Sequence, residues 1–361
     1  MHITEIDKHE GFNSCCSHNE FVIEDSVCKK YYTENNLIHL NTITEVEVVS
    51  YLNTRIANKS NLDSLKINSN EDDCIIINQA DNSFKINGEL VNSKNITISK
   101  YISNGCYGVI FVSSSVEGII YVIKLIIYNE NNINEINTMI DIKINNNIPN
   151  FINIAYYHLK CNTITNIPNT LSEGINTCLK NKKYTMLILE YFDGDIYSIL
   201  IQHRKDNEII KCIYSQLLLS IYLFHNKFNY YHNDAHLKNF LYKKVVNDNK
   251  YYHYNILDNN YYIKNEGYVI VLSDFGLSTK IEPEKIEINK IRADYYKILF
   301  DIKHNLVFID EKFKTKFLEY LNPTMSGYDE LEFLHFMMTN ILNIETKITE
   351  DITLINEIPY N

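Results

Sequence analysis

The stretch Tyr230-Tyr-His-Asn-Asp-Ala-His-Leu-Lys-Asn-Phe-Leu241 decides how the rest of the chain is interpreted. It places Asp234 five residues before Asn239, in a short polar segment with apolar sequence on both sides. A second stretch, Val269-Ile-Val-Leu-Ser-Asp-Phe-Gly276, is a run of strand-forming residues that ends on Asp274. Together these side chains offer one potential base and two oxygen ligands for a hard cation.

This set suits phosphoryl transfer from a nucleotide. One carboxylate would accept the proton of an attacking hydroxyl, while an amide and a second carboxylate would hold Mg2+ on the nucleotide's phosphates. The stretch around Asp234 resembles the catalytic loop H-R-D-L-x-x-x-N of the eukaryotic-type protein kinase superfamily, and Asp274-Phe-Gly276 resembles its D-F-G motif. The resemblance covers about residues 96 to 361.

The resemblance implies an α+β, bilobal protein-kinase-like fold with a β-rich N-lobe and a mainly α-helical, reduced C-lobe. We expect the N-lobe over residues 96–192 and the C-lobe over residues 193–361, with a β insertion at about residues 242–268. Residues 71–95 are expected to form a β-hairpin that leads into the kinase. Residues 1–70 are an N-terminal extension to which the sequence assigns no role.

Composition indicates a soluble globular protein, with 45% hydrophobic and 22% charged residues among 361. A net charge of −11 argues against a nucleic-acid-binding surface. No apolar run is long enough to span a membrane, the N-terminus has no signal-peptide pattern, and the eight cysteines lack paired spacing. We expect an intracellular, cytoplasmic protein with reduced cysteines, virion-associated if its source is a virus.

The N-terminal extension contains a group of potential zinc ligands: His9, Cys15, Cys16, His18 and Cys28. Adjacent cysteines are not the C-x-x-C spacing that a tetrahedral site prefers, so reduced thiols are the favoured interpretation. Residues 43–56 carry apolar residues at mixed helical spacing, which indicates an amphipathic helix.

Short β-runs follow at residues 74–77, 83–86 and 96–101, with Asn87-Gly88 as a predicted hairpin turn. Gly105-Cys-Tyr-Gly108 then stands between two strands, and Lys124 follows Gly108 by 16 residues within a third. This layout resembles the glycine-rich loop and the V-A-I-K lysine of kinases. Ser103 replaces the loop's first glycine, and Val122 stands where the family has alanine.

A polar helix is predicted over residues 131–147, with Ile133, Ile136, Met139, Ile140 and Ile142 as its buried stripe. Glu135 is the expected partner of Lys124, because it shares a helix face with Met139. The alternatives are Asp141 as the partner, or a Glu135 that is simply a solvated helix residue.

The strand predicted over residues 184–192 resembles the kinase hinge, with Leu189 as the gatekeeper and the backbone of Glu190 and Phe192 hydrogen-bonded to adenine. The resemblance thus implies that ATP binds to the following residues: Ile102, Ser103, Asn104, Gly105, Cys106, Tyr107, Gly108, Val109, Ile110, Val122, Lys124, Leu189, Glu190, Phe192 and Leu241.

The most regular helix is predicted over residues 209–228 and leads to the catalytic loop. Asn239 and Asp274 then stand 35 positions apart, room for an added β-hairpin with Tyr-rich strands. In this respect, and in its Gly- and Pro-poor composition, the chain resembles the divergent protein kinases of large DNA viruses, poxvirus virion kinases among them. Asp294 is expected to begin a central helix and brace the catalytic loop, and further helices are predicted around residues 313–321 and 328–342.

Three positions of the catalytic loop depart from the family pattern. Asn233 replaces the arginine that pairs with a phosphorylated activation loop, so we predict an enzyme that loop phosphorylation does not switch on. His236 replaces the lysine that touches the transferred phosphate, as in haspin-like kinases and small-molecule phosphotransferases. Lys238 is close enough in sequence to supply that charge instead.

The leading interpretation is an ATP- and Mg2+-dependent kinase that phosphorylates Ser/Thr hydroxyls of proteins. Asp234 would be the base, Asn239 and Asp274 the metal ligands, and Lys124, fixed by Glu135, the anchor of the nucleotide's phosphates. One alternative keeps the fold and changes the substrate to a small-molecule alcohol or amine. A non-enzymatic pseudokinase is the other, although the lysine and both aspartates that such proteins usually lose are present.

Overall fold

The computed structural model describes residues 23–24, 27–28, 71–78, 83–87, 96–104, 108–116, 118–129, 132–145, 150–164, 179, 181–247, 250–305, 315, 318–319, 321, 329–347 and 354–360. The chain forms two compact units. Unit 1 comprises Met1–Ile43, Ala57–Ile144 and Asn153–Tyr191, and unit 2 comprises Thr44–Ile56, Asn145–Ile152 and Phe192–Asn361. The predicted zinc ligands and the helix predicted over residues 43–56 lie outside the residues whose side chains are described.

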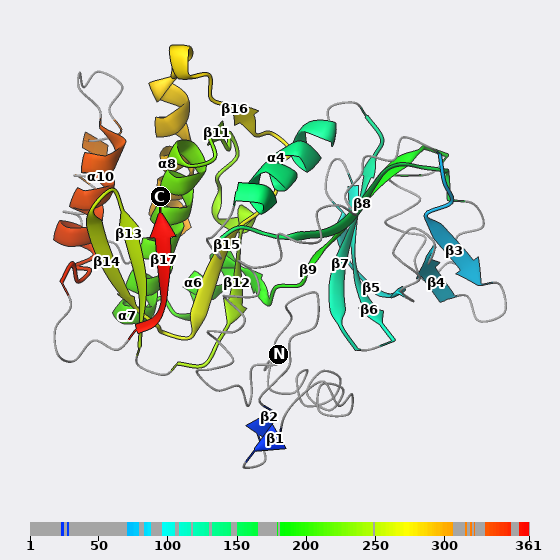
Figure 1. The fold of residues 1–361 in the computed structure, drawn as a ribbon, viewed down its shortest axis with the longest axis horizontal. Helices are drawn as coiled ribbons and strands as arrows, with labels where there is room; N and C mark the ends of the chain where they lie inside the picture. The colour runs from blue at the N-terminus through cyan, green and yellow to red at the C-terminus, as the bar shows by residue number, and fades with distance from the viewer. Residues whose placement is uncertain are drawn as a thin grey trace. The chain divides into compact units, whose positions relative to one another are not determined.

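Unit 1 is built on one large antiparallel sheet (Figure 1). Its strands, in spatial order, are β3 (Ile75–Asn78), β4 (Ser83–Ile86), β5 (Ile96–Asn104), β6 (Gly108–Ser115), β7 (Ile120–Ile127), β9 (Tyr184–Glu190) and β8 (Ile154–Cys161). A separate antiparallel pair is formed by β1 (Ile23–Glu24) and β2 (Val27–Cys28). The β-runs predicted from residues 74, 83 and 96 are thus present as β3, β4 and β5, while the predicted turn residue Gly88 lies outside the described residues.

Strands of the unit 1 sheet differ in burial: β6 buries alternate residues, whereas β9 buries all of its residues. In β6, Val109, Phe111 and Ser113 are fully buried while the residues between them are partly exposed, which is the period of two that a strand with one covered face requires. β9 lies between β7 and β8, and every one of its side chains is buried. These strands hold the predicted nucleotide-binding residues of this unit in a fixed register.

One helix of unit 1 bears on the predicted site. It is α4 (Asn132–Asn145), close to the helix predicted over residues 131–147. It buries Ile136, Met139 and Ile142 of the predicted stripe, whereas Ile133 and Ile140 are partly exposed. Glu135 is buried on the same helix and is only 4% exposed, so an acidic side chain enters the apolar face and needs a cation as its partner.

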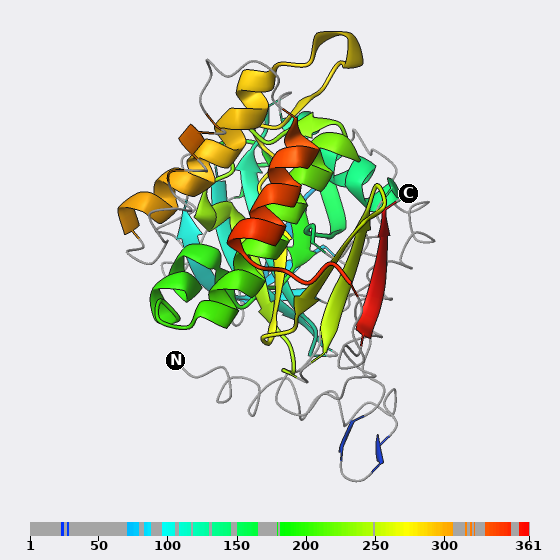
Figure 2. The same cartoon turned by 90° about the vertical axis from the view of Figure 1, so that its left-hand side faces the viewer.

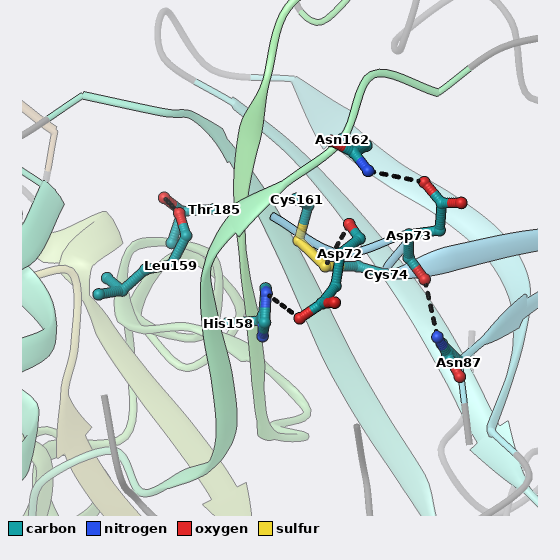
Figure 3. Close-up of a disulfide and its surroundings, with 9 residues drawn as sticks. All are labelled: Asp72, Asp73, Cys74, Asn87, His158, Leu159, Cys161, Asn162 and Thr185. Atoms are coloured by element: carbon teal, nitrogen blue, oxygen red, sulfur yellow. Dashed lines mark hydrogen bonds and ion pairs between the residues drawn. A yellow bond between two sulfur atoms is a disulfide. The ribbon is translucent and has the colours of Figure 1, made fainter. Parts of the chain in front are cut away.

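The two edges of the sheet meet at one point. β3 is one edge strand and β8 the other, yet Asp72, just before β3, forms a parallel bridge with Cys161 at the end of β8. The Asp72 N–H donates to Lys160 O at 3.3 Å, and the Asn162 N–H donates to Asp72 O at 2.9 Å. A disulfide joins Cys74 to Cys161 at this point (Figure 3). The sheet is therefore curled, and a covalent bond holds its edges together.

The expectation of reduced cysteines is wrong for this pair. Its spacing gives no signal, because 87 residues separate Cys74 from Cys161 and only the curl of the sheet brings them together. Charged groups reinforce the junction: Glu71 lies 2.5 Å from the ammonium groups of both Lys160 and Lys183. Hydrogen bonds from these two lysines lower the pKa of Glu71 to about 2.

Unit 2 mixes helices and strands among its described residues, so the expected predominance of α-helix is met only in part. Its helices are α6 (Ile196–Gln202), α7 (Asn207–Asn226), α8 (Ile288–Asn305) and α10 (Glu330–Phe336), which continues into a π-helical turn (Met337–Ile341). Its strands are β10 (Gly194–Asp195), β11 (Tyr230–Tyr231), β12 (Phe240–Lys244), β13 (Tyr251–Ile256), β14 (Asn259–Lys264), β15 (Tyr268–Leu272), β16 (Thr279–Lys280) and β17 (Leu354–Tyr360). A bilobal kinase fold stays a prediction.

Helix α7 is the helix predicted over residues 209–228, and it fixes the strand that leads to Asp274. Its N-cap is Asp206, whose Oδ1 accepts from the Ile209 N–H at 3.2 Å. From this buried helix the Gln216 side chain donates to Tyr268 O at 2.9 Å and accepts from the Ile270 N–H at 3.0 Å. A buried amide satisfied by strand backbone on both sides locks β15 to the helix.

The predicted β insertion is present as the β13–β14 hairpin. Its two-residue turn places Leu257 and Asp258 at φ of 45° and 69°, the left-handed pair that a type I′ turn uses. Strand β17 then adds to β13 in parallel, which the sequence does not predict; Figure 2 shows it in red beside the yellow-green hairpin. The helix predicted over residues 328–342 is present as α10 and its π-helical turn, while the one over residues 313–321 lies mostly outside the described residues.

Among the residues that the structure places, no helix combines the length and apolarity that a membrane span requires.

Candidate functional site

The predicted catalytic loop runs between two strands of unit 2. It leaves β11 at Tyr231, forms a single 3-10 turn at Leu237–Asn239 and enters β12 at Phe240. Asn233 adopts a left-handed φ of 61°, and its side chain donates to Leu277 O and Thr279 Oγ1, both at 2.9 Å. The loop is therefore tied to the segment that follows Asp274 by an amide rather than by a charge.

Asp234 and Asn239 face each other within this loop. The Asn239 side-chain nitrogen donates to Asp234 O at 2.9 Å and approaches Asp234 Oδ2 at 3.3 Å. The Asp234 side chain keeps 32% of its surface exposed. A partly exposed carboxylate of fixed orientation is what a base acting on a bound hydroxyl requires.

The loop and the predicted D-F-G segment meet at one end of the β12–β15 ladder. Phe240 pairs with Leu272 in this ladder, and the Ser273 N–H and hydroxyl donate to Asn239 O at 2.9 Å and 2.8 Å. Asp274 follows directly, is exposed and has a left-handed φ of 59°. Unit 2 thus brings the Asn239 and Asp274 stretches to the same strand ends.

The donor set at these strand ends fits Mg2+. The side-chain nitrogen of Asn239 donates within the loop, so the side-chain oxygen Oδ1 is the atom that can face a cation. Asp274 adds an exposed carboxylate. Mg2+ is usually held by one or two such oxygens together with substrate phosphates rather than by a full protein cage. Within the described residues no group of three or more His, Cys, Asp or Glu side chains is placed to hold a metal ion.

A buried histidine, His232, links the backbone of the catalytic loop to that of the D-F-G segment. His232 is fully buried beside Phe224 and Phe275, with ring centroids 5.7 Å and 5.8 Å away. Burial lowers the pKa of His232, so the ring is neutral. Its Nε2 donates to Ser273 O at 3.0 Å, while Nδ1 accepts the Asp234 N–H at 3.3 Å. A neutral histidine therefore bridges the backbone of the two predicted catalytic stretches.

The predicted contact of Asp294 with the loop is also present, but α8 begins at Ile288, so Asp294 lies within the helix and not at its start as predicted. Asp294 is fully buried on α8, and its Oδ2 accepts from the His232 N–H at 2.8 Å and lies 3.1 Å from His225 Nε2. The other ring nitrogen of His225 lies 2.7 Å from Glu330 Oε1. Burial opposes a charge on His225, but the Glu330 and Asp294 carboxylates outweigh it and raise its pKa to about 9. An ionic network thus ties α7, α8 and α10 to the loop.

The sequence did not identify one residue at this site, Lys297. Its ammonium lies 2.9 Å from Asp234 Oδ1 and also donates to Asn233 O. Lys297 stands three residues after Asp294 on α8, hence on the same helix face. That spacing was the available signal, because a helix braced against the loop through Asp294 must present its next turn to the same loop.

The two alternative cations of the loop lie in different surroundings. His236 Nε2 is 3.5 Å from Asp234 Oδ2, beyond a strong hydrogen bond. Lys238 is exposed, and its ammonium lies over the Tyr197 ring, 5.7 Å from the centroid. Of the two, only His236 stands beside the Asp234 carboxylate.

In unit 1 the predicted lysine and glutamate form a pair. Lys124 Nζ lies 2.8 Å from Glu135 Oε1, and their side chains are 17% and 5% exposed. The partner is Glu135 rather than Asp141, and Glu135 is not a solvated helix residue. The roles of both groups toward a nucleotide stay predictions.

The predicted phosphate-binding strands lie next to this lysine. Lys124 is opposite Ile110 in the β6–β7 ladder, and Gly108 is opposite Ile126. A Cβ on Gly108 would lie 2.3 Å from Leu125 O, so close strand packing alone requires this glycine. Gly105, Cys106 and Tyr107 lie outside the described residues, while Ile102, Ser103 and Asn104 belong to β5.

The predicted adenine-binding residues other than Phe192 occupy inner strands. Val122 is opposite Leu189 in the β7–β9 ladder of unit 1. The Glu190 N–H already donates to Asn153 O at 3.4 Å, and its side chain is buried. In unit 2, Phe192 is buried and Leu241 lies in β12 opposite Val271. That these residues surround one nucleotide stays a prediction.

No family model matches this sequence. The chain is 26% identical over 130 residues to a protein named "Probable serine/threonine-protein kinase 380R" of Invertebrate iridescent virus 6. The aligned region covers 36% of this chain and 21% of that protein, so only about a fifth of the relative is matched. This similarity supports a distant relationship to kinases.

Proposed function

We propose that this chain is an ATP- and Mg2+-dependent protein kinase that transfers the γ-phosphate to Ser or Thr hydroxyls. The observation that carries the proposal is the meeting of the Asp234–Asn239 loop with the Ser273–Asp274 segment at one end of the β12–β15 ladder. A base and two oxygen ligands at one place are the protein groups that phosphoryl transfer to a hydroxyl needs. The name of the iridescent virus relative points the same way.

Each residue has a defined task in this proposal. Asp234 orients the hydroxyl of the substrate and accepts its proton, helped by the Asn239 amide at 3.3 Å that limits rotation of the carboxylate. Asn239 and Asp274 would hold Mg2+, which when bound offsets the negative charge of the phosphates. Lys124 holds the α- and β-phosphates and is itself fixed by Glu135 at 2.8 Å.

One observation favours a second candidate function, a small-molecule phosphotransferase. That observation is the position of His236, which stands where the usual lysine is, as in choline-kinase- and aminoglycoside-kinase-like proteins. The segment before α8 agrees with it, because Asp294 follows Asp274 by only 20 positions. So short a segment leaves little surface on which an extended peptide could dock. The protein substrate is therefore the part of the proposal that most needs a direct assay.

The test is transfer of label from γ-labelled ATP by the wild-type chain and by Asp234→Ala, with Mg2+ or with excess chelator. Basic protein acceptors and a panel of small alcohols and amines are compared. We expect label on serine or threonine of protein, lost with Asp234→Ala and without Mg2+. Label on a small alcohol alone would support the second candidate. No transfer to any acceptor, together with no Mg2+-dependent thermal shift by ATP, would contradict both and favour a pseudokinase.

A further inference from the structure

The Asp234 carboxylate has a cation beside it that comes from outside the catalytic loop. Lys297 of α8 places its ammonium 2.9 Å from Oδ1 and also donates to the carbonyl of Asn233. An ammonium has three N–H donors, and these contacts use two of them. Oδ2 faces the Asn239 amide at 3.3 Å, so both oxygens of the carboxylate have a directed neighbour.

The loop itself lacks a lysine or arginine at the two positions where the family has one. Asn233 and His236 stand at the positions of the family's arginine and lysine, and Lys238 lies over the Tyr197 ring. A phosphate that approaches Asp234 meets a like charge, and this repulsion must be offset by a nearby cation. Lys297 is so placed that it can offset this repulsion.

Helix α8 is held so that Lys297 must reach the loop. Asp294, on the same helix face, accepts the His232 N–H at 2.8 Å. At the start of the helix, the Glu287 N–H donates to Tyr231 Oη at 2.6 Å, and the Lys290 ammonium lies over the Tyr231 ring, 5.2 Å from its centroid. The short segment between Asp274 and Asp294 leaves the first turns of the helix directly against the loop.

The pair is too exposed to be explained by stability. The Lys297 and Asp234 side chains are 38% and 32% exposed, and ion pairs with this exposure add little to folding. Lys211 on α7 offers a comparison within the same unit. It is 34% exposed and pairs with Glu208 Oε1 at 2.8 Å, and neither residue contacts the loop in the described structure.

We propose that Lys297 is a positioning residue for phosphoryl transfer, one that fixes the Asp234 carboxylate and supplies the positive charge that the catalytic loop lacks. The role rests on the proposed function. It replaces both earlier alternatives, His236 and Lys238, as the source of that charge.

The test compares Lys297→Met, Lys297→Arg and the matched control Lys211→Met in the full chain, with kcat and the KM for ATP measured separately. We expect Lys297→Met to lower kcat by about 100-fold, because a small displacement of a catalytic group has a cost of this size, with the KM for ATP within about twofold. Lys297→Arg should recover part of kcat, and Lys211→Met should leave kcat unchanged. Thermal melting of each variant verifies that it is folded.

A rescue experiment separates charge from side-chain packing. Lys297→Cys treated with 2-bromoethylamine acquires an ammonium at nearly the same reach, and wild-type protein given the same treatment is the control. We expect kcat to return toward that of treated wild-type protein.

The outcomes distinguish this role from the proposed function. Asp234-dependent transfer by wild-type protein with no loss of kcat in Lys297→Met would overturn the role and leave the function standing. Equal losses in Lys297→Met and Lys211→Met, or no rescue of kcat by the restored ammonium, would also overturn the role. A wild-type chain without Asp234-dependent transfer would overturn both.

Discussion

The ammonium of Lys124 lies 2.8 Å from Oε1 of Glu135, a helix side chain that is only 5% exposed. The same helix carries Asp141, which the sequence left open as the partner. The structure therefore offers two acidic residues on one helix for comparison, a buried one paired with the lysine and a partly exposed one.

Glu135→Gln should destabilise unit 1 and impair nucleotide binding, whereas Asp141→Asn should have smaller effects because Asp141 is partly exposed and Glu135 is buried. Loss of the carboxylate leaves a largely buried ammonium without its charged acceptor, a defect that costs about 1–3 kcal/mol in free energy of unfolding. Urea unfolding and titration with ATP and Mg2+ measure the two effects. Equal behaviour of the two variants would show that the Lys124–Glu135 pair has no special role.

The free energy of unfolding should depend on pH through the protonation of His225. Its pKa is raised from 6.5 to about 9 by Glu330 and Asp294 in the folded protein. The folded state therefore binds this proton more tightly than the unfolded state. The resulting stabilisation is complete below about pH 6.5 and is lost as the pH rises toward 9.

The loss over that range is on the order of 3 kcal/mol for a shift of this size. Chemical unfolding of wild-type protein and of His225→Gln from pH 6 to pH 9.5 measures it. The variant should start less stable and show a flatter profile. Parallel profiles of the two proteins would mean that His225 is not charged in the folded state.

Reduction should loosen the sheet of unit 1. The Cys74–Cys161 bond closes a loop of 87 residues, and a cross-link of this kind contributes about 2–4 kcal/mol. We expect a lower Tm in dithiothreitol for wild-type protein, and the same lowered Tm with or without dithiothreitol for Cys74→Ser/Cys161→Ser. Peptide mapping without reduction should find the two cysteines linked.

Cys212 provides the control for this measurement. It is a free, buried cysteine whose pKa is raised to about 11 by burial, so it should resist alkylation in the folded protein. Rapid alkylation of Cys74 or Cys161 in native, unreduced protein would contradict the pairing.

Activity should not depend on phosphorylation of the segment after Asp274. The Asn233 amide holds this segment through Leu277 O and Thr279 Oγ1, contacts that need no phosphate. Phosphatase treatment should leave turnover unchanged, and Thr279→Val should lower it only slightly, since one neutral hydrogen bond is lost. Inactivation by phosphatase, reversed on rephosphorylation, would show that the loop is switched after all.

The sequence predicted the parts of the candidate site that depend on local pattern. The loop at Asp234, the strand that ends before Asp274, the helix that carries Glu135 and the inserted hairpin all follow from periodicity and short motifs. Asp294 was identified through the resemblance to kinases, although α8 begins six residues before it, at Ile288. In each case the residues that define the element are neighbours in the chain.

Contacts between segments that are distant in the chain could not be predicted from the sequence. Lys297 lies 63 positions from Asp234 in sequence, and nothing near either residue marks the pair. The Cys74–Cys161 bond depends on the curl of seven strands. The pairing of β17 with β13 likewise requires the chain's last strand to return to an insertion about a hundred residues earlier. Such contacts are set by the whole fold, not by local propensity.

The closed edge of the unit 1 sheet limits how the polypeptide can be shortened for study. A truncation that begins at Ile96, where the resemblance to kinases starts, would delete β3 and β4 and expose β5, still paired with β6, as an edge strand. It would also remove Cys74, the disulfide partner of Cys161. Glu71, which pairs with both Lys160 and Lys183, would be lost as well. The shortest fragment worth expressing therefore starts before Glu71, upstream of any recognisable catalytic motif.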